Sequence, residues 1–155
     1  MQNSLKLKKR SGFSLIELLV VVAILGIISG IGVLSYSGYV ESTKRKSVEN
    51  ILMQMSLGQS EYYADNNVYH TIHGCNSIGS AITTATDITS TQLEDALLGG
   101  QDNVNDELGY HFCSGPGGTT NFTIWAAEQG ASNACVISMN SNNTFTKIRQ
   151  DGADC

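Results

Sequence analysis

The sequence has little proline, little positive charge beyond its first residues, and no arrangement typical of a catalytic site. Pro116 is the single proline, so no residue of this kind interrupts a helix in the N-terminal half. Ser, His and Asp residues are present, but no spacing orders them as a catalytic triad, and the chain has no glycine-rich phosphate loop. The sequence therefore predicts a protein that is not an enzyme and that binds no cofactor.

Positive charge is concentrated before Gly12, where four of the nine Lys and Arg residues lie: Lys6, Lys8, Lys9 and Arg10. If this leader is removed, five basic residues remain against fourteen Asp and Glu, a side-chain balance of about −9. Such a surface repels phosphate backbones, so DNA is not the favoured partner. A negative net charge does not exclude a local basic patch. The run Lys44-Arg45-Lys46 is a candidate for a lipid or nucleic-acid patch, but a solvated helix face is the preferred interpretation.

The four cysteines lie well outside the apolar N-terminal segment and form no Cys-x-x-Cys pair: Cys75, Cys113, Cys135 and Cys155. An even number of cysteines in an exported chain predicts two disulfides in an oxidising compartment. Four cysteines allow three pairings, and their spacing does not choose among them.

The segment 1–12 is short, basic and nearly free of apolar side chains. A secretory signal places its small-residue cleavage site after an apolar stretch, whereas Gly12 stands before one. Cleavage after Gly12 would retain the apolar segment and start it with a free amine on Phe13.

Residues 13–34 carry no charge apart from Glu17 and are numerous enough to cross a bilayer as a helix. The basic leader would stay in the cytoplasm, so residues 35–155 would face the periplasm or the outside. A carboxylate in a membrane helix costs roughly 2.5–3.5 kcal/mol, which makes Glu17 a functional candidate. Its expected partner is the amine of Phe13, within one helix or between neighbouring subunits; the alternative is an incidental acid near the interface.

Beyond residue 34 the pattern changes twice. Apolar residues at helical spacing, from Val40 to Tyr63, predict an amphipathic helix over 35–65. The connection 66–107 is rich in polar residues and contains Thr91-Gln92-Leu93-Glu94, a capping-box pattern that predicts a short helix of about two turns.

The segment 108–155 predicts three or four antiparallel strands, because short apolar runs alternate with turn residues. The expected strands are 108–113, 122–128, 135–139 and 144–149. The expected turns are 114–119, 130–133 and 140–143. The fold class is therefore α+β, with a long N-terminal helix packed on a C-terminal sheet. Its core candidates are Phe122, Ile124, Val136, Ile137, Phe145 and Ile148.

Two metal sites were weighed and neither is predicted. His70, His73 and Cys75 have a spacing that suggests zinc, but a fourth ligand is missing and the compartment favours disulfides. The oxygen-rich run 102–107 suggests calcium, but Val104 interrupts it and it has no central glycine, so a solvated turn is preferred.

The N-terminal residues closely resemble the signature of type IV pilins, including the type IVa and minor pilin branch. The matching stretches are Lys8-Lys9-Arg10-Ser11-Gly12 and Phe13-Ser14-Leu15-Ile16-Glu17-Leu18. The likeness continues with Gly26, Tyr36, Tyr39 and the stretch 61–66, and it weakens after about residue 70. One departure is Leu34, which stands where many members have a helix-kinking proline; Gly26, Gly30 and Gly32 would supply weak points or close helix packing instead.

The resemblance implies cleavage between Gly12 and Phe13 by a prepilin peptidase, N-methylation of Phe13, and pairing of Glu17 with the Phe13 amine of an adjacent subunit. A C-terminal disulfide loop is usual in pilins, which implies Cys135–Cys155 and leaves Cys75–Cys113. The implied partners are other pilins, in a homo- or hetero-polymer, and the inner-membrane assembly machinery. The precursor would lie in the inner membrane and the product in an extracellular pilus.

Three functions follow from this resemblance. The leading prediction is a major or minor pilin of a type IV pilus that supports adhesion, twitching motility or DNA uptake. The alternatives are a pseudopilin of a type II secretion system and a pilin that acts as a DNA-uptake receptor. Paired disulfides argue mildly against the first alternative, and the negative charge argues against the second.

Overall fold

The computed structural model describes residues 12–72, 75, 85–100, 108–115, 120–130, 134–149 and 151–155. The chain divides into two compact units, Met1–Ser42 and Thr43–Cys155, called unit 1 and unit 2 below. Each unit is described by itself.

A single helix, α1 (Leu15–Asn66), contributes to both units. No proline interrupts its 52 residues, and it ends where Asn67 adopts a left-handed backbone conformation with φ 57°. Its part in unit 1 contains one stretch, Leu15–Gly32, that is long and apolar enough to cross a membrane, with a mean hydropathy of 2.6. None of that stretch is buried within the chain.

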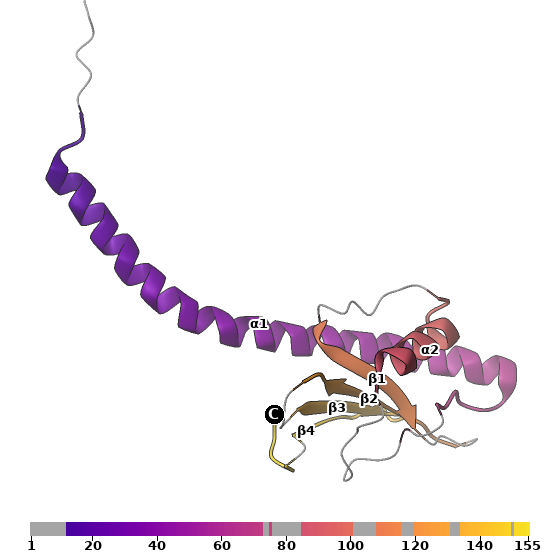
Figure 1. Ribbon diagram of the computed structural model, residues 1–155. Helices are drawn as coiled ribbons and strands as arrows, with labels where there is room; N and C mark the ends of the chain where they lie inside the picture. The colour runs from indigo at the N-terminus through magenta and orange to yellow at the C-terminus, as the bar shows by residue number, and fades with distance from the viewer. Residues whose placement is uncertain are drawn as a thin grey trace, which may run out of the picture. The chain divides into compact units, whose positions relative to one another are not determined.

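Unit 2 contains the rest of α1, a second helix and one antiparallel sheet (Figure 1). The elements are α2 (Asp87–Leu97), β1 (Tyr110–Gly115), β2 (Thr123–Glu128), β3 (Cys135–Asn140) and β4 (Phe145–Arg149). The strands pair in the order β1-β2-β3-β4, each with its neighbour in the chain. The predicted α+β class, a long N-terminal helix with a C-terminal antiparallel sheet of four strands, is confirmed.

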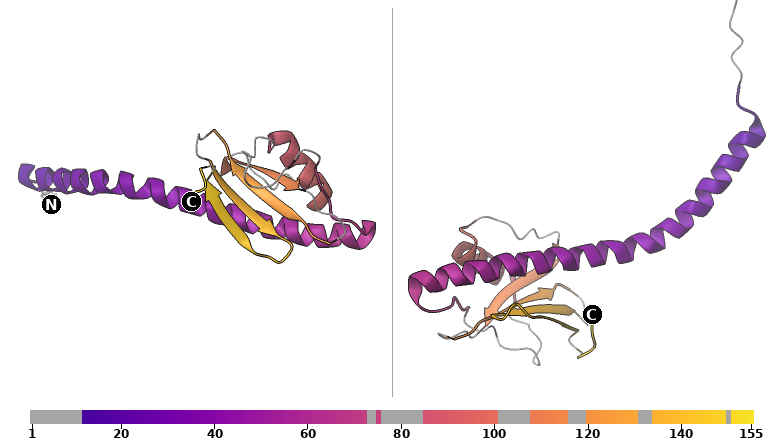
Figure 2. Two further views of the ribbon diagram at one scale, coloured as in Figure 1. Left: turned by 90° about the horizontal axis from the view of Figure 1, so that it is seen from below. Right: turned by 180° about the vertical axis from the view of Figure 1, so that it is seen from behind.

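The main core lies between one face of this sheet and the two helices, which cover that face together (Figure 2). The apolar stripe of α1 supplies Val48, Leu52 and Met55, all fully buried, and Leu93 of α2 joins them. The sheet supplies Phe112, Ile124 and Ile137. Full burial of one such side chain stabilises a fold by about 1.5–3 kcal/mol, so this cluster gives unit 2 a core of its own.

A second, smaller apolar cluster lies on the opposite face of the sheet, and the sequence analysis missed it. Its buried members are Cys75, Cys113, Trp125, Ala127 and Val136. Val136 was predicted to share the main core with Ile137, which is wrong because successive residues of a strand point to opposite faces. Both faces of the sheet are therefore partly covered.

The first strand extends further than predicted, to Gly115 rather than Cys113. Gly115 pairs with Thr123, and the six-membered ring of Trp125 lies directly against its Cα. Any side chain at this position would overlap that ring, so the glycine serves close packing inside a strand rather than a turn.

Helix α2 begins at Asp87, well before the predicted start at Thr91. Its capping box consists of Thr86 and Thr89, whose side-chain hydroxyls each accept a hydrogen bond from the other's backbone N–H. The first turn, Asp87-Ile88-Thr89-Ser90, is rich in residues with low helix propensity, which hid it from the sequence pattern.

Tertiary contacts explain why this turn is nevertheless helical. The Thr89 hydroxyl donates to the Phe112 carbonyl at 2.8 Å, and the Phe112 N–H donates to the Ser90 hydroxyl at 2.9 Å. These groups lie on the edge of β1 that no strand pairs, so the hydroxyls of α2 take the place of a neighbouring strand.

Candidate functional site

The start of α1 brings the predicted processing and assembly residues together. Phe13 is 87% exposed, and Ser14 precedes the first helical residue as its N-cap. The Glu17 carboxylate accepts a hydrogen bond from the Ser14 N–H at 2.9 Å, which is the acidic half of a capping box. Glu17 thus points back along the chain to a position one residue from Phe13.

This arrangement gives Glu17 a partner in the chain that still carries its leader. Cleavage between Gly12 and Phe13 would convert the peptide N–H of Phe13, one residue before the Ser14 donor, into an ammonium group. A charged donor of this kind makes a hydrogen bond to a carboxylate that is roughly twice as strong as one from a neutral N–H.

The four cysteines form two disulfides in unit 2. Cys135 is bonded to Cys155 with their Cα atoms 5.9 Å apart, and Cys75 is bonded to Cys113 at 6.0 Å. These are the pairs that the pilin resemblance implies. The first fixes the last residues to β3, and the second fixes the connection before α2 to β1.

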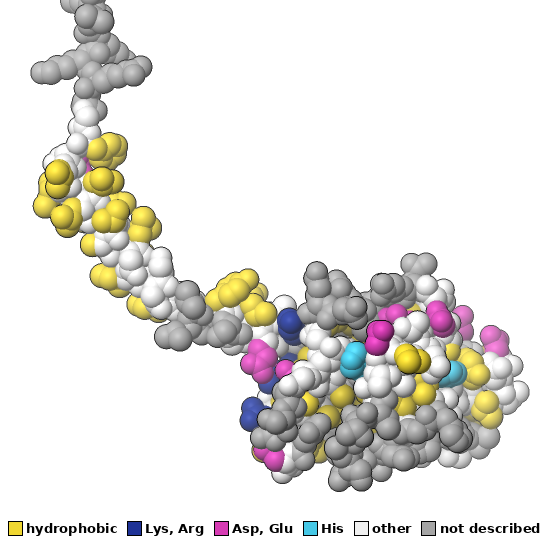
Figure 3. All heavy atoms as spheres, in the orientation of Figure 1, with side chains coloured by type: hydrophobic (Ala, Val, Ile, Leu, Met, Phe, Trp, Pro, Cys, Tyr) yellow, Lys and Arg dark blue, Asp and Glu magenta, His cyan; other side chains and the backbone are white. Residues whose placement is uncertain are grey.

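All five Lys and Arg residues that follow Gly12 lie in two segments of unit 2, 44–46 on α1 and 147–149 on β4. We call these residues the basic cluster: Lys44, Arg45, Lys46, Lys147 and Arg149. On the face drawn in Figure 3, the dark blue side chains gather at one end of unit 2, whereas the other end shows acidic side chains and no dark blue ones.

Glu49 and the C-terminal residues join the two halves of the basic cluster. The Glu49 carboxylate forms ion pairs with Lys46, at 2.9 Å, and with Lys147. The Arg45 guanidinium donates to the backbone oxygen of Cys155, whose disulfide partner Cys135 pairs with Arg149 across the sheet. Residues 43–49 and 145–155 hold five basic and three acidic side chains, a local net charge of +2 in a chain that is negative elsewhere.

Two opposing influences act on the pKa of Glu49, whose side chain is only 12% exposed. Burial raises this pKa, but the hydrogen bonds and positive charges of Lys147 and Lys46 outweigh burial and hold the pKa below the usual value for a glutamate. Glu49 is therefore ionised at neutral pH and partly neutralises two cations of the basic cluster.

The two metal sites weighed above have different outcomes. Cys75 is bonded to Cys113 and His73 lies outside the described residues, so the structure does not assemble a zinc site from them. Burial lowers the pKa of His70, and its backbone groups are hydrogen-bonded to the buried amide of Gln59. The run 102–107 also lies outside the described residues, and among those that are described no group of three His, Cys, Asp or Glu side chains could hold a metal.

Comparison with known families agrees with this arrangement. Residues 7–33 match the model of the prokaryotic N-terminal methylation motif, which covers Gly12, Phe13 and Glu17. Residues 35–139, more than half of the chain, match the model described as type IV minor pilin ComP, DNA uptake sequence receptor. The chain belongs to this family of type IV minor pilins.

A part of this pilin is also similar to a curated fimbrial protein. The fimbrial protein EcpC of Eikenella corrodens is 37% identical over 60 residues. The alignment covers 39% of this pilin and 39% of the relative, so the pilin spans well under two thirds of that protein's length. The family is one of pilus subunits, in line with the expectation that the chain has a structural role rather than a catalytic one.

Sequence reasoning predicted the processing residues, the role of Glu17 and the disulfide cysteines, but not the basic cluster. The five basic residues were visible, yet Lys44-Arg45-Lys46 and Lys147 lie about a hundred residues apart in the chain. The signal that could have revealed the cluster is that all five residues lie in two short segments. In most chains Lys and Arg residues are spread over the surface.

Proposed function

We propose that this pilin is a minor subunit of a type IV pilus that binds double-stranded DNA through the basic cluster. The observation that carries the proposal is that every Lys and Arg side chain of the processed chain lies in this cluster, on two segments that share Glu49. The family description supports DNA as the ligand.

The overall charge of about −9 argued against DNA in the sequence analysis, and the distribution of charge resolves this conflict. Repulsion from distant acidic residues is screened within about 8–10 Å at physiological salt, whereas phosphates at the cluster would meet the cations directly. Acidic residues elsewhere on unit 2 then help to orient the duplex, because they repel it from every other surface.

Glu49 determines how many of these cations a phosphate meets. Lys46 and Lys147 each contact one of its carboxylate oxygens, so a bound phosphate competes with Glu49 for them. Lys46, with its side chain 69% exposed, can turn to a phosphate without loss of packing. Binding of moderate strength follows from this competition, and its salt dependence follows from the counterions that the phosphates release.

We further propose that cleavage between Gly12 and Phe13, N-methylation of Phe13 and pairing of its amine with Glu17 carry the protein from the inner membrane into an extracellular pilus. Prepilin peptidase and the inner-membrane assembly machinery are the expected partners before assembly, and other pilins afterwards. The apolar side chains of unit 1, none of them buried within the chain over Leu15–Gly32, support this proposal, because a membrane or neighbouring helices must cover them.

Fluorescence anisotropy with a labelled duplex, over a series of salt concentrations, tests the DNA proposal on the processed chain. Lys147→Ala should weaken binding and reduce the slope of log affinity against log salt by about one. Glu49→Gln should strengthen binding because it frees two cations, whereas Glu61→Gln, an exposed acid at the end of α1, should change it little. Absence of salt-dependent binding, or equal effects of the two acid substitutions, would contradict the proposal.

Mass spectrometry of sheared surface filaments tests the assembly proposal. The expected result is this chain beginning at methylated Phe13 and present in the filament fraction. Absence from filaments together with a secretion defect on deletion would instead favour the pseudopilin alternative. DNA uptake is the process that the proposal selects, and adhesion and twitching motility would depend on the same filament.

A further inference from the structure

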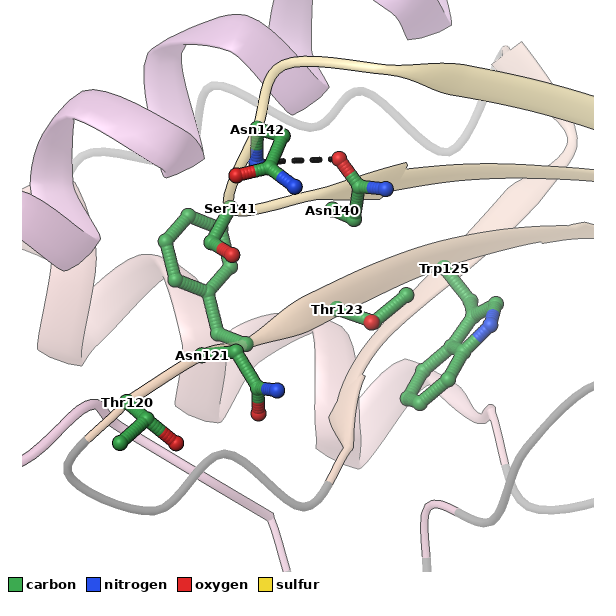
Figure 4. A pocket seen from close by; sticks show the side chains of 8 residues that line it. Thr120, Asn121, Thr123, Trp125, Asn140, Ser141 and Asn142 are labelled. Carbon is green, nitrogen blue, oxygen red and sulfur yellow. Dashed lines mark hydrogen bonds between the residues drawn. The ribbon is translucent and has the colours of Figure 1, made fainter.

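A cleft of about 570 Å³ opens beside the β3–β4 turn, and neither the processing motif nor the basic cluster contributes to it. Its walls are the residues that lead into β2 and the turn that follows β3 (Figure 4). The lining residues are Thr120, Asn121, Phe122, Thr123, Trp125, Asn140, Ser141 and Asn142. None of them is Lys, Arg, Asp or Glu.

The walls of this cleft are held together by the backbone. Thr123 pairs with Asn140 across the β2–β3 ladder, and the Ser141 N–H donates to the Phe122 carbonyl at 3.0 Å. The turn is also fixed to α1, because the Ser56 hydroxyl donates to the side-chain carbonyl of Asn143 at 3.2 Å. The backbone that carries the polar groups of the cleft is therefore fixed before any ligand arrives, which lowers the entropic cost of binding.

Asn140 shows how this positioning works. Its side-chain oxygen accepts hydrogen bonds from the N–H groups of Asn142 and Thr144, each at 3.0 Å. Both contacts fix which way the amide faces, so the NH₂ group points away from the turn, as Figure 4 shows. Asn140 thus presents an oriented pair of donors beside the Thr123 hydroxyl, its partner in the ladder.

The chemistry of the lining selects a class of ligand. Side-chain amides and hydroxyls donate and accept hydrogen bonds without charge, whereas Phe122 and Trp125 are almost completely buried. A phosphate or carboxylate would find no cation here, and an apolar ligand would leave the amides unsatisfied. A sugar ring carries uncharged hydroxyls that both donate and accept hydrogen bonds, which matches the amides and hydroxyls of this lining.

We propose that this cleft binds a neutral saccharide of one or two rings. The volume lies within the range of about 300–1,000 Å³ that small-molecule sites occupy. The binding site is separate from the basic cluster, so the proposal goes beyond the proposed DNA function and does not depend on it.

NMR of the ¹⁵N-labelled processed chain tests this proposal. The protein is held in dodecylphosphocholine micelles, because the disaccharide head group of a maltoside detergent would compete with the probes for the cleft. The probes are three neutral disaccharides, maltose, lactose and N,N′-diacetylchitobiose. At least one should shift the side-chain amide signals of Asn121, Asn140 and Asn142 saturably, with little change in signals from α2.

Two variants, each with a matched control, locate the site. Thr123→Val removes one hydroxyl from a central strand and Asn142→Ala removes an exposed amide, and each should weaken binding about fivefold through a lost hydrogen bond. Thr146→Val on β4 and Asn50→Ala on α1 make the same changes outside the cleft and should leave the affinity unchanged. If Thr123→Val fails to fold, Asn142→Ala still decides, because its side chain is exposed.

Three results would overturn the proposal. The first is that none of the three disaccharides shifts these signals at millimolar concentrations. The second is that the controls weaken binding as much as the cleft variants do. The third is that a short DNA duplex shifts the same amide signals and competes with the sugar, which would make the cleft part of the nucleic-acid surface.

Discussion

Units 1 and 2 use the same helix in opposite ways. In unit 1, α1 has apolar side chains on all sides and buries none of its span Leu15–Gly32 within the chain. In unit 2, α1 keeps one apolar stripe, buries it against a sheet and leaves its polar face to solvent. The apolar side chains of unit 1 need a membrane or neighbouring helices to cover them, whereas unit 2 has its own core. Substitutions can therefore affect the proposed assembly and the proposed ligand binding independently.

Loss of the Glu17 charge in unit 1 should have the largest effect of the changes considered, and this effect is on filament assembly. Glu17→Val should abolish incorporation into filaments while cleavage after Gly12 continues, because an unpaired amine at Phe13 would have to be buried. Immunoblots of membrane and sheared fractions, with the N-terminus determined by mass spectrometry, measure both steps.

Glu17→Gln is the matched control for this substitution. The glutamine oxygen can still accept from the Ser14 N–H and preserve the helix start, but it carries no charge. Impaired assembly in both variants would assign the effect to charge. Normal filaments with either variant would show that the pairing of Glu17 with Phe13 is not required.

Removal of the disulfides should be the largest perturbation of unit 2. On the chain-entropy model, Cys135→Ser with Cys155→Ser should cost about 3 kcal/mol, and Cys75→Ser with Cys113→Ser about 4 kcal/mol, because the second loop is longer. Urea unfolding followed by the fluorescence of Trp125, the single tryptophan, reports on unit 2. The opposite ranking of the two pairs would show that native contacts, rather than loop closure, determine their contributions.

The same substitution at two glycines of α1 should have opposite effects in the two units. A Cβ at Gly58 would overlap the backbone oxygen of Leu97, so Gly58→Ala should destabilise unit 2 by about 1–3 kcal/mol. Gly30 has nothing within 4 Å of that position, so Gly30→Ala should stabilise the helix by about 1 kcal/mol.

Two measurements separate these effects. The urea midpoint of Trp125 fluorescence should fall for Gly58→Ala and stay unchanged for Gly30→Ala, whereas amide exchange around residue 30 should slow only in the latter. A normal midpoint for Gly58→Ala would mean that α1 and α2 can move apart without loss of packing.

The smallest expected effect is a pH dependence that arises from Glu49 in unit 2. Its pKa is lower in the folded chain than the ordinary 4.5, so its contribution to stability is present above pH 4.5 and is lost as the pH falls through the folded value. Wild type should therefore exceed Glu49→Gln in thermal midpoint at about pH 7, and the difference should be smaller at a pH below 4.5. An equal difference at both pH values would exclude ionisation of Glu49 as its cause.

The sequence predicted those parts of the molecule whose signals are local. The leader, Phe13, Glu17 and the apolar span follow one another in the chain, and the strands are marked by period and turns. The start of α2 was missed because Thr89 and Ser90 are helical through their bonds to Phe112 of β1. The basic cluster and the cleft were missed for a related reason. The basic cluster joins α1 to β4, and the cleft joins β2 to β3, and only the folded chain brings these segments together.

The hydroxyls of α2 on the edge of β1 have a consequence for how copies of this protein can join. An open strand edge is a template on which another chain can add a strand, and a secreted protein at high local concentration risks uncontrolled growth there. Thr89, Ser90 and the Ile72 N–H, which bonds to the Ser114 carbonyl, occupy backbone groups that such a strand would need. These contacts disfavour growth of the sheet from β1, which supports the proposed assembly through α1.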